Sequence, residues 1–187
     1  MITDFKFKII IAMAIISFLT LFKDAHAQEV KIEDVILSGK CSKCDFRNRD
    51  LTQVNFSNIN LRHSNFEGAN LNVSMFKGAM LRKAIFSNAQ IVSASFSDAH
   101  LSNSDFSNSL LYDTDFYRAN LSNVNFQNAD LTAARLNGAS LIRAKLRGAN
   151  LTGANLKDAN LLQADMLGAI ICNTVLPNGE VSYVGCR

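Results

Sequence analysis

A chain of 187 residues with a formal net charge of +3 is long enough for one domain of ordinary size. Its 19 basic and 16 acidic residues nearly cancel, which excludes the strong overall field that recruits nucleic acid or an acidic substrate. The four cysteines allow disulfides to form if the chain is exported to an oxidising compartment.

Residues 1–27 are typical of an export signal. Lys6 and Lys8 precede an apolar run over residues 9–22, and an Ala-His-Ala cleavage site ends at Ala27. The run is short for a membrane span, which needs about 20 residues. We therefore expect a periplasmic or extracellular protein that begins at Gln28 and keeps no stable membrane span after cleavage. The alternative is an uncleaved N-terminal anchor.

Residues 28–45 are expected to form an N-terminal cap. Ile32, Val35 and Ile36 have helical spacing, which predicts a short helix that ends near Ser38-Gly39.

Residues 46–171 form a repeat with a period of five. All 26 centres, taken every fifth residue from Phe46 to Ile171, are Phe, Leu, Ile or Met, and a small residue usually stands two positions before each centre. Successive centres would spiral around an α-helix and would alternate between the faces of a straight strand. The chain must therefore turn once per repeat to bury every centre, with Asn, Asp and Ser suited to the tight bends.

The centres also carry a second period of ten. From Phe46 to Leu131, Phe alternates with Leu or Ile. A coil with an even number of sides stacks like residues on like, whereas a three-sided coil would stack Phe on Leu. Regular packing therefore favours an even number of sides.

The pattern in Ala69-Asn70-Leu71 and Ala149-Asn150-Leu151 resembles the pentapeptide-repeat proteins. That resemblance implies an all-β fold, a right-handed, four-sided parallel β-helix with small terminal caps. At about 4.8 Å per coil, the solenoid would be about 30 Å long. The Cys-x-x-Cys pair ahead of the repeats and the Leu-Pro-Asn-Gly near the end also resemble exported members of the family.

Residues 172–187 are expected to form a C-terminal cap, with a turn at Pro177-Asn178-Gly179 and a short strand over residues 180–184. The cysteines lie in two pairs at opposite ends of the expected rod, which argues against one shared zinc site. We expect the disulfides Cys41–Cys44 and Cys172–Cys186. A redox-active Cys-x-x-Cys and free thiols are the alternatives.

The outward positions offer little chemistry. His63 and His100 lie far apart, and four aspartates, Asp98, Asp105, Asp113 and Asp115, are dispersed over three faces. No catalytic triad, phosphate-binding loop or metal cluster emerges, so we expect neither enzyme activity, nor a cofactor, nor a bound metal.

A few outward positions are apolar instead of polar. Val92, Leu110, Tyr112 and Tyr117 are the candidates for an interaction patch, because Val92 and Tyr112 stack one above the other with Leu110 beside them. The alternative is a set of scattered surface residues. A basic cluster toward the C-terminus is interpreted as a solvated face: Arg135, Arg143, Lys145, Arg147 and Lys157.

These features predict a non-enzymatic exported solenoid that acts as a rigid structural or protein-interaction module. Its partner would be a protein or a component of the cell envelope, and no nucleic acid is expected. The alternative is a topoisomerase-binding DNA mimic of the quinolone-resistance type, from which the export signal, the weakly charged surface and the uninterrupted repeats depart. A carbohydrate-cleaving β-helix enzyme would need stacked catalytic carboxylates.

Overall fold

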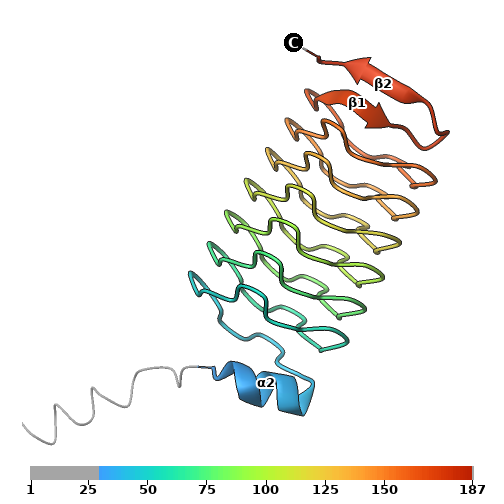
Figure 1. Ribbon diagram of the computed structural model, residues 1–187. Coiled ribbons are helices and arrows are strands. Elements are labelled where there is room, and N and C mark those ends of the chain that lie inside the picture. The colour runs from blue at the N-terminus through green and yellow to red at the C-terminus, as the bar shows by residue number, and fades with distance from the viewer. Residues whose placement is uncertain (1–29, 187) are drawn as a thin grey trace, which may run out of the picture. The chain divides into compact units, whose positions relative to one another are not determined.

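The computed structural model describes residues 30–186 (Figure 1). The expected signal at residues 1–27 lies outside the described residues. The chain divides into two units, and the second, Ile32–Arg187, carries every element named below. These are helix α2 (Ile32–Ser38) and strands β1 (Ile171–Val175) and β2 (Val181–Val184).

Between α2 and β1 the chain winds as a right-handed, four-sided parallel β-helix. Each isolated parallel bridge joins a residue to the residue 20 positions further on, from Lys40↔Asn60 to Asn155↔Val175. Four pentapeptides therefore make one coil, which agrees with the even number of sides favoured by the sequence and with the four sides implied by the family resemblance. The sides are named here by their first centres: the Phe46, Leu51, Phe56 and Leu61 sides.

Backbone hydrogen bonds account for four of the five N–H groups in a repeat. At the first centre, Phe46 N donates to Asn65 O at 2.7 Å, and Asn48 N donates to Glu67 O at 3.0 Å. The N–H of Asn65 donates back to Cys44 O at 2.8 Å, and Arg49 N closes the turn onto Phe46 O at 3.3 Å. The remaining N–H, one position after the centre, points away from the ladder and needs another acceptor.

Asparagine and aspartate supply that acceptor from the position before the centre. Their side-chain Oδ1 accepts from the N–H two residues on, as at Asn55 with Ser57 N (3.0 Å) and Asn155 with Lys157 N (3.0 Å). The sequence interpretation placed these residues at the bends. The structure places their backbone mid-side, and it is the side chain that holds the bend, in an Asx turn.

The bend itself lies in the two residues after each centre. The second of them has a positive φ at every corner from Lys43 (63°) to Asn173 (53°). With the turn-closing hydrogen bond, this is the geometry of a type II turn, which favours Gly or Asn at that position.

The core consists of stacked centres. Phe46, Phe66, Phe86, Phe106 and Phe126 form one column, with ring centroids 4.5 to 5.3 Å apart. A second column begins at Phe56 and meets the first in edge-to-face contacts such as Phe76–Phe86, at 6.0 Å. All of these rings are fully buried. The stacking of like on like confirms the prediction from the ten-residue period.

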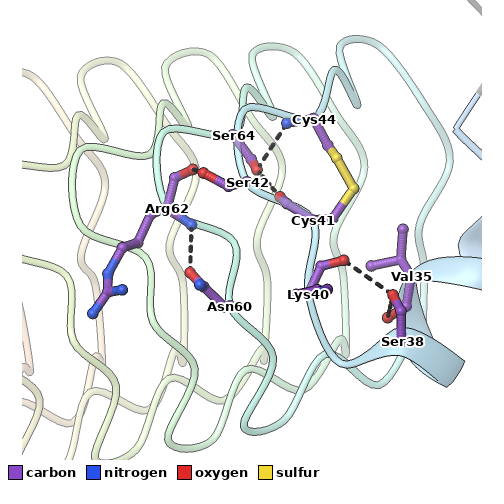
Figure 2. The surroundings of a disulfide bond; sticks show 9 residues. All are labelled: Val35, Ser38, Lys40, Cys41, Ser42, Cys44, Asn60, Arg62 and Ser64. Carbon is purple, nitrogen blue, oxygen red and sulfur yellow. Dashed lines mark hydrogen bonds between the residues drawn. A yellow bond between two sulfur atoms is a disulfide. The ribbon is translucent and has the colours of Figure 1, made fainter.

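Helix α2 and the first disulfide form the N-terminal cap. The helix lies where the spacing of apolar residues predicts it, with Val35 buried and Gly39, at φ 65°, ending it. Cys41 and Cys44 are joined across the first turn. The Ser64 hydroxyl donates to Cys41 O at 2.8 Å and accepts from Cys44 N at 3.2 Å, which fastens the disulfide turn to the next coil (Figure 2).

Strand β2 forms the C-terminal cap by pairing antiparallel with β1, which is the last Leu51 side of the solenoid (Figure 1). The turn over residues 177–179 is closed by Gly179 N donating to Leu176 O at 2.9 Å. The second disulfide joins Cys172 to Cys186. The structure therefore has the two local pairs that the sequence favours.

Candidate functional site

The residues that could carry acid–base or metal chemistry are dispersed. His63 lies at a corner, and His100 lies mid-side two coils further on; both are exposed. The four aspartates are each occupied: Asp98 and Asp115 pair with Arg118 and Arg135, Asp113 accepts from Ser93 Oγ, and Asp105 accepts from Asn125. Within residues 30–186 no group of three His, Cys, Asp or Glu is placed to hold a metal ion.

One group of exposed apolar side chains lies at a corner in the middle of the solenoid. Another lies on the last coil and β2: Leu162, Leu167, Val181, Tyr183 and Val184. We define the apolar corner patch as Val73, Val92, Leu110 and Tyr112. The backbone ladder places them in three successive coils: Val73 N donates to Val92 O at 2.9 Å, and Ser93 N donates to Tyr112 O at 2.9 Å. Leu110 projects from the Leu51 side just before the corner and pairs with Gln90 in the coil below.

The apolar corner patch is open to solvent. Val73, Leu110 and Tyr112 have exposed fractions of 51%, 49% and 50%, and Val92 is half-buried between its neighbours. Polar residues border it on both sides along the corner. In the coil before Val92, Asn72 Oδ1 accepts a hydrogen bond from Val92 N at 2.8 Å. In the coil after Tyr112, the Thr132 hydroxyl donates a hydrogen bond to Asp130 at 2.5 Å. The patch is thus an apolar surface with a polar rim.

Tyr117, the fourth candidate from the sequence, lies elsewhere. It occupies the next corner, across the Phe56 side from Tyr112, and Asp115 projects between them. The N–H of Tyr117 donates to Asp115 Oδ1 at 3.0 Å, and the Arg118 guanidinium lies 6.0 Å from the Tyr117 ring centroid. Tyr117 therefore does not extend the apolar corner patch.

Val73 is the member that sequence reasoning missed. It occupies the left-handed position of its corner, with φ 60°. Among the corner residues with positive φ it is the only one with a branched Cβ, for which this conformation is a genuine outlier. Its side chain is exposed, so core packing does not explain the choice. The signal was available in the sequence, because most equivalent corner positions hold Asn, Asp or Gly.

The basic cluster expected toward the C-terminus is neutralised in part. Arg135 pairs with Asp115 at 3.9 Å, Arg147 pairs with Asp165 at 3.8 Å, and Arg143 Nε donates to Gln163 at 2.8 Å. Surface pairs of this kind contribute little to stability, and they leave no concentrated positive field. The interpretation as a solvated face is consistent with these contacts.

Comparison with known families agrees with the coil geometry. A family model described as a pentapeptide repeat region matches residues 40–116, and one described as pentapeptide repeats (8 copies) matches residues 99–138 and 139–176. The chain belongs to the pentapeptide-repeat family. Together the matches run from the start of the first coil to the end of β1, so the family accounts for the solenoid.

Several solved pentapeptide-repeat structures are similar to this one. HetL, a protein involved in heterocyst differentiation regulation in a Nostoc cyanobacterium, is 19% identical, with 81% of this chain and 98% of HetL covered and a TM-score of 0.36. A protein of the Arabidopsis thaliana thylakoid lumen is 28% identical, with coverages of 71% and 72% and a TM-score of 0.40. The plasmid-mediated fluoroquinolone resistance protein QnrB1 is 19% identical, with coverages of 74% and 84% and a TM-score of 0.37.

Comparison with curated protein sequences yields no match. Within residues 30–186, no helix has the length and hydropathy to cross a membrane.

Proposed function

We propose that this pentapeptide-repeat protein is an exported, non-enzymatic scaffold that binds a protein partner through the apolar corner patch. The solenoid supplies rigidity, because every coil is tied to the next by the backbone ladder and by stacked centres. The patch supplies the recognition surface. The proposal assigns no chemistry to the protein, and no cofactor.

The observation that carries the proposal is the exposed Val73 in a left-handed conformation. Such strain costs on the order of 1 kcal/mol and persists where something other than stability selects the residue. At this corner Asn or Gly would relieve the strain. Valine adds apolar surface directly beside Val92, and two coils along the same corner as Tyr112.

The chemistry of the apolar corner patch favours a protein partner. Contiguous exposed apolar surface with a polar rim is typical of protein–protein contacts, and tyrosine is enriched in them. Tyr112 and Leu110 are anchors that a complementary pocket would desolvate.

Export is supported by the disulfide at each end of the solenoid. Disulfides persist in oxidising compartments and are rare in the cytosol. A protein found only in the cytoplasm of intact cells, with its cysteines as free thiols, would contradict this part of the proposal and would favour the topoisomerase-binding alternative.

The test of the binding surface uses residues that the fold already accepts at equivalent positions. Replacing Leu110→Asn and Tyr112→Thr copies Asn150 and Thr152, which occupy the same side and corner two coils on and are hydrogen-bonded to each other at 2.7 Å. We expect this variant to fold and to lose the partner adduct that crosslinking in the native compartment gives with the unsubstituted protein.

The matched control removes the same kinds of side chain outside the patch. Ile85→Asn copies Asn65 and Asn125 on the Phe46 side, and Tyr117→Ser copies Ser57 and Ser97 at its corner. This control is expected to keep the adduct. Retention of the adduct by the patch variant, or its equal loss from both variants, would contradict the proposed surface.

A further inference from the structure

A second surface lies at a different corner, between the Leu61 and Phe46 sides at the N-terminal end. We define the basic corner strip as Lys43, Arg62, His63, Arg82 and Lys83. The ladder places its members in three successive coils, since Lys43 N donates to Arg62 O at 2.9 Å and His63 N donates to Arg82 O at 3.1 Å. Successive coils lie about 4.8 Å apart, so like charges are stacked closely.

The strip is not neutralised by acidic neighbours. No Asp or Glu occupies an outward position of the Leu61 side or of the corner that follows it, from Lys40 to Gln163. All five side chains of the strip are exposed, and within residues 30–186 none of them makes a side-chain hydrogen bond or an ion pair. The sequence also adds Lys40 and His100 on the adjoining side.

The acidic residue nearest in sequence is held away from the strip. Asp45 forms a salt bridge with Arg47 at 2.6 Å, toward the opposite corner of the Phe46 side. The hydrogen bonds from the Arg47 side chain and backbone lower the pKa of Asp45 to about 2. Its charge is therefore matched by Arg47 and not by Lys43.

At other corners and sides, residues 20 positions apart carry opposite charges and pair across the coils. Arg118 lies over Asp98 at 3.7 Å, and Arg135 lies over Asp115 at 3.9 Å, so that stacked positions alternate in sign. In the basic corner strip Arg62 is stacked with Arg82 instead, and no carboxylate lies at an outward position of this corner. Cations stacked in this way repel each other, and an anionic surface would relieve that repulsion.

We propose that the basic corner strip docks the solenoid on an anionic phospholipid surface. The strip lacks the apolar or aromatic anchor that a protein hot spot needs, and it lacks the aromatic residues on which bases of a single-stranded nucleic acid stack. The strip can therefore bind a partner only through its positive charge. A membrane carrying anionic headgroups is planar and is recognised by clusters of four to eight Lys or Arg through charge alone. Cations along a straight corner reach such a plane together.

The solenoid provides neutral replacements for the test. The same corner holds Ser-Asn at residues 102–103 and again at 122–123. The strip variant is Arg62→Ser, Arg82→Ser and Lys83→Asn. The control removes three cations from other surfaces with residues found at equivalent positions there: Lys77→Ser, Lys145→Asn and Lys157→Ser.

The experiment measures co-sedimentation with vesicles of phosphatidylcholine alone and of phosphatidylcholine mixed with phosphatidylglycerol, using protein purified from the compartment where it accumulates. We expect binding only to the anionic vesicles, and we expect it to weaken as salt rises. Each Lys or Arg near an anionic surface contributes a factor of about five, so the strip variant should bind about 100-fold more weakly. The control should stay within a few-fold of the unsubstituted protein.

Three outcomes would overturn the proposal. Equal binding to both kinds of vesicle would mean that charge is not what is recognised. An equal loss in the strip variant and the control would mean that overall charge, and not this corner, is responsible. Binding to heparin without binding to anionic vesicles would identify a soluble polyanion as the partner. Circular dichroism spectra of the variants verify that each retains the fold.

Discussion

At the scale of the residue, each pentapeptide position has a separate physical task. The centre and the small residue before it fill the core, the Asn or Asp between them accepts the one N–H that the ladder leaves unpaired, and the second corner residue adopts positive φ. Val73 adopts this positive φ, but its branched Cβ makes valine an unfavourable residue for it. Because nothing in the core requires valine there, its presence is the residue-scale observation on which the proposed contact surface rests.

This predicts that Val73→Asn stabilises the protein. Asn tolerates the left-handed conformation, and the substitution removes strain of about 1 kcal/mol without disturbing the core. Urea denaturation should show the increase in the free energy of unfolding. Ala133→Asn, at the same corner three coils further on, is the control and should change stability by less, because Ala133 has no branched Cβ and its side chain makes no hydrogen bond. Unchanged or reduced stability of the Val73 variant would refute the strain argument.

At the scale of the element, the two caps cover the exposed end coils of the solenoid with different structures. The N-terminal cap uses α2 and a disulfide across one turn, whereas the C-terminal cap folds β2 back onto β1 and ties it with Cys172–Cys186. The second disulfide encloses the whole hairpin. On the chain-entropy account, a 15-residue loop of this kind stabilises by about 3 kcal/mol.

We therefore predict a local effect when Cys172 and Cys186 are both replaced by Ser. Hydrogen exchange of the β1 and β2 amides should accelerate, corresponding to a loss of about 3 kcal/mol in the free energy of opening. Amides near Phe86 should exchange as before, because coils of a solenoid couple mainly to their neighbours. Replacing Cys41 and Cys44 should leave β2 unchanged. Uniform acceleration along the chain would contradict this picture of independent caps.

At the scale of the whole molecule, the sequence predicts the fold well because a strict repeat leaves few solutions. The five-residue period specifies the inward positions, and the alternation of Phe and Leu favours an even number of sides; both agree with the Phe46 and Phe56 columns. The short helix before the repeats and the strand after Gly179 also follow from local patterns.

The surfaces were harder to predict, because they depend on which residues stack across coils. Val92 and Tyr112 follow from a 20-residue offset, but Val73 requires knowledge of which corner position is left-handed. The net charge of the chain does not reveal the basic corner strip, because the acidic residues that balance its charge lie on other sides of the coil. Sorting the outward positions by their place in the coil separates Lys43, Arg62 and Arg82 from those acids.

The most direct test of the central claim is site-specific photocrosslinking at the apolar corner patch. A photoreactive amino acid at position 112 is compared with one at position 117, where Tyr117 occupies the next corner and lies outside the apolar corner patch. The account predicts a discrete adduct with one protein from position 112 in the native compartment and none from position 117. Equal crosslinking from both positions, or none from position 112 in cells where the protein is exported, would contradict the account.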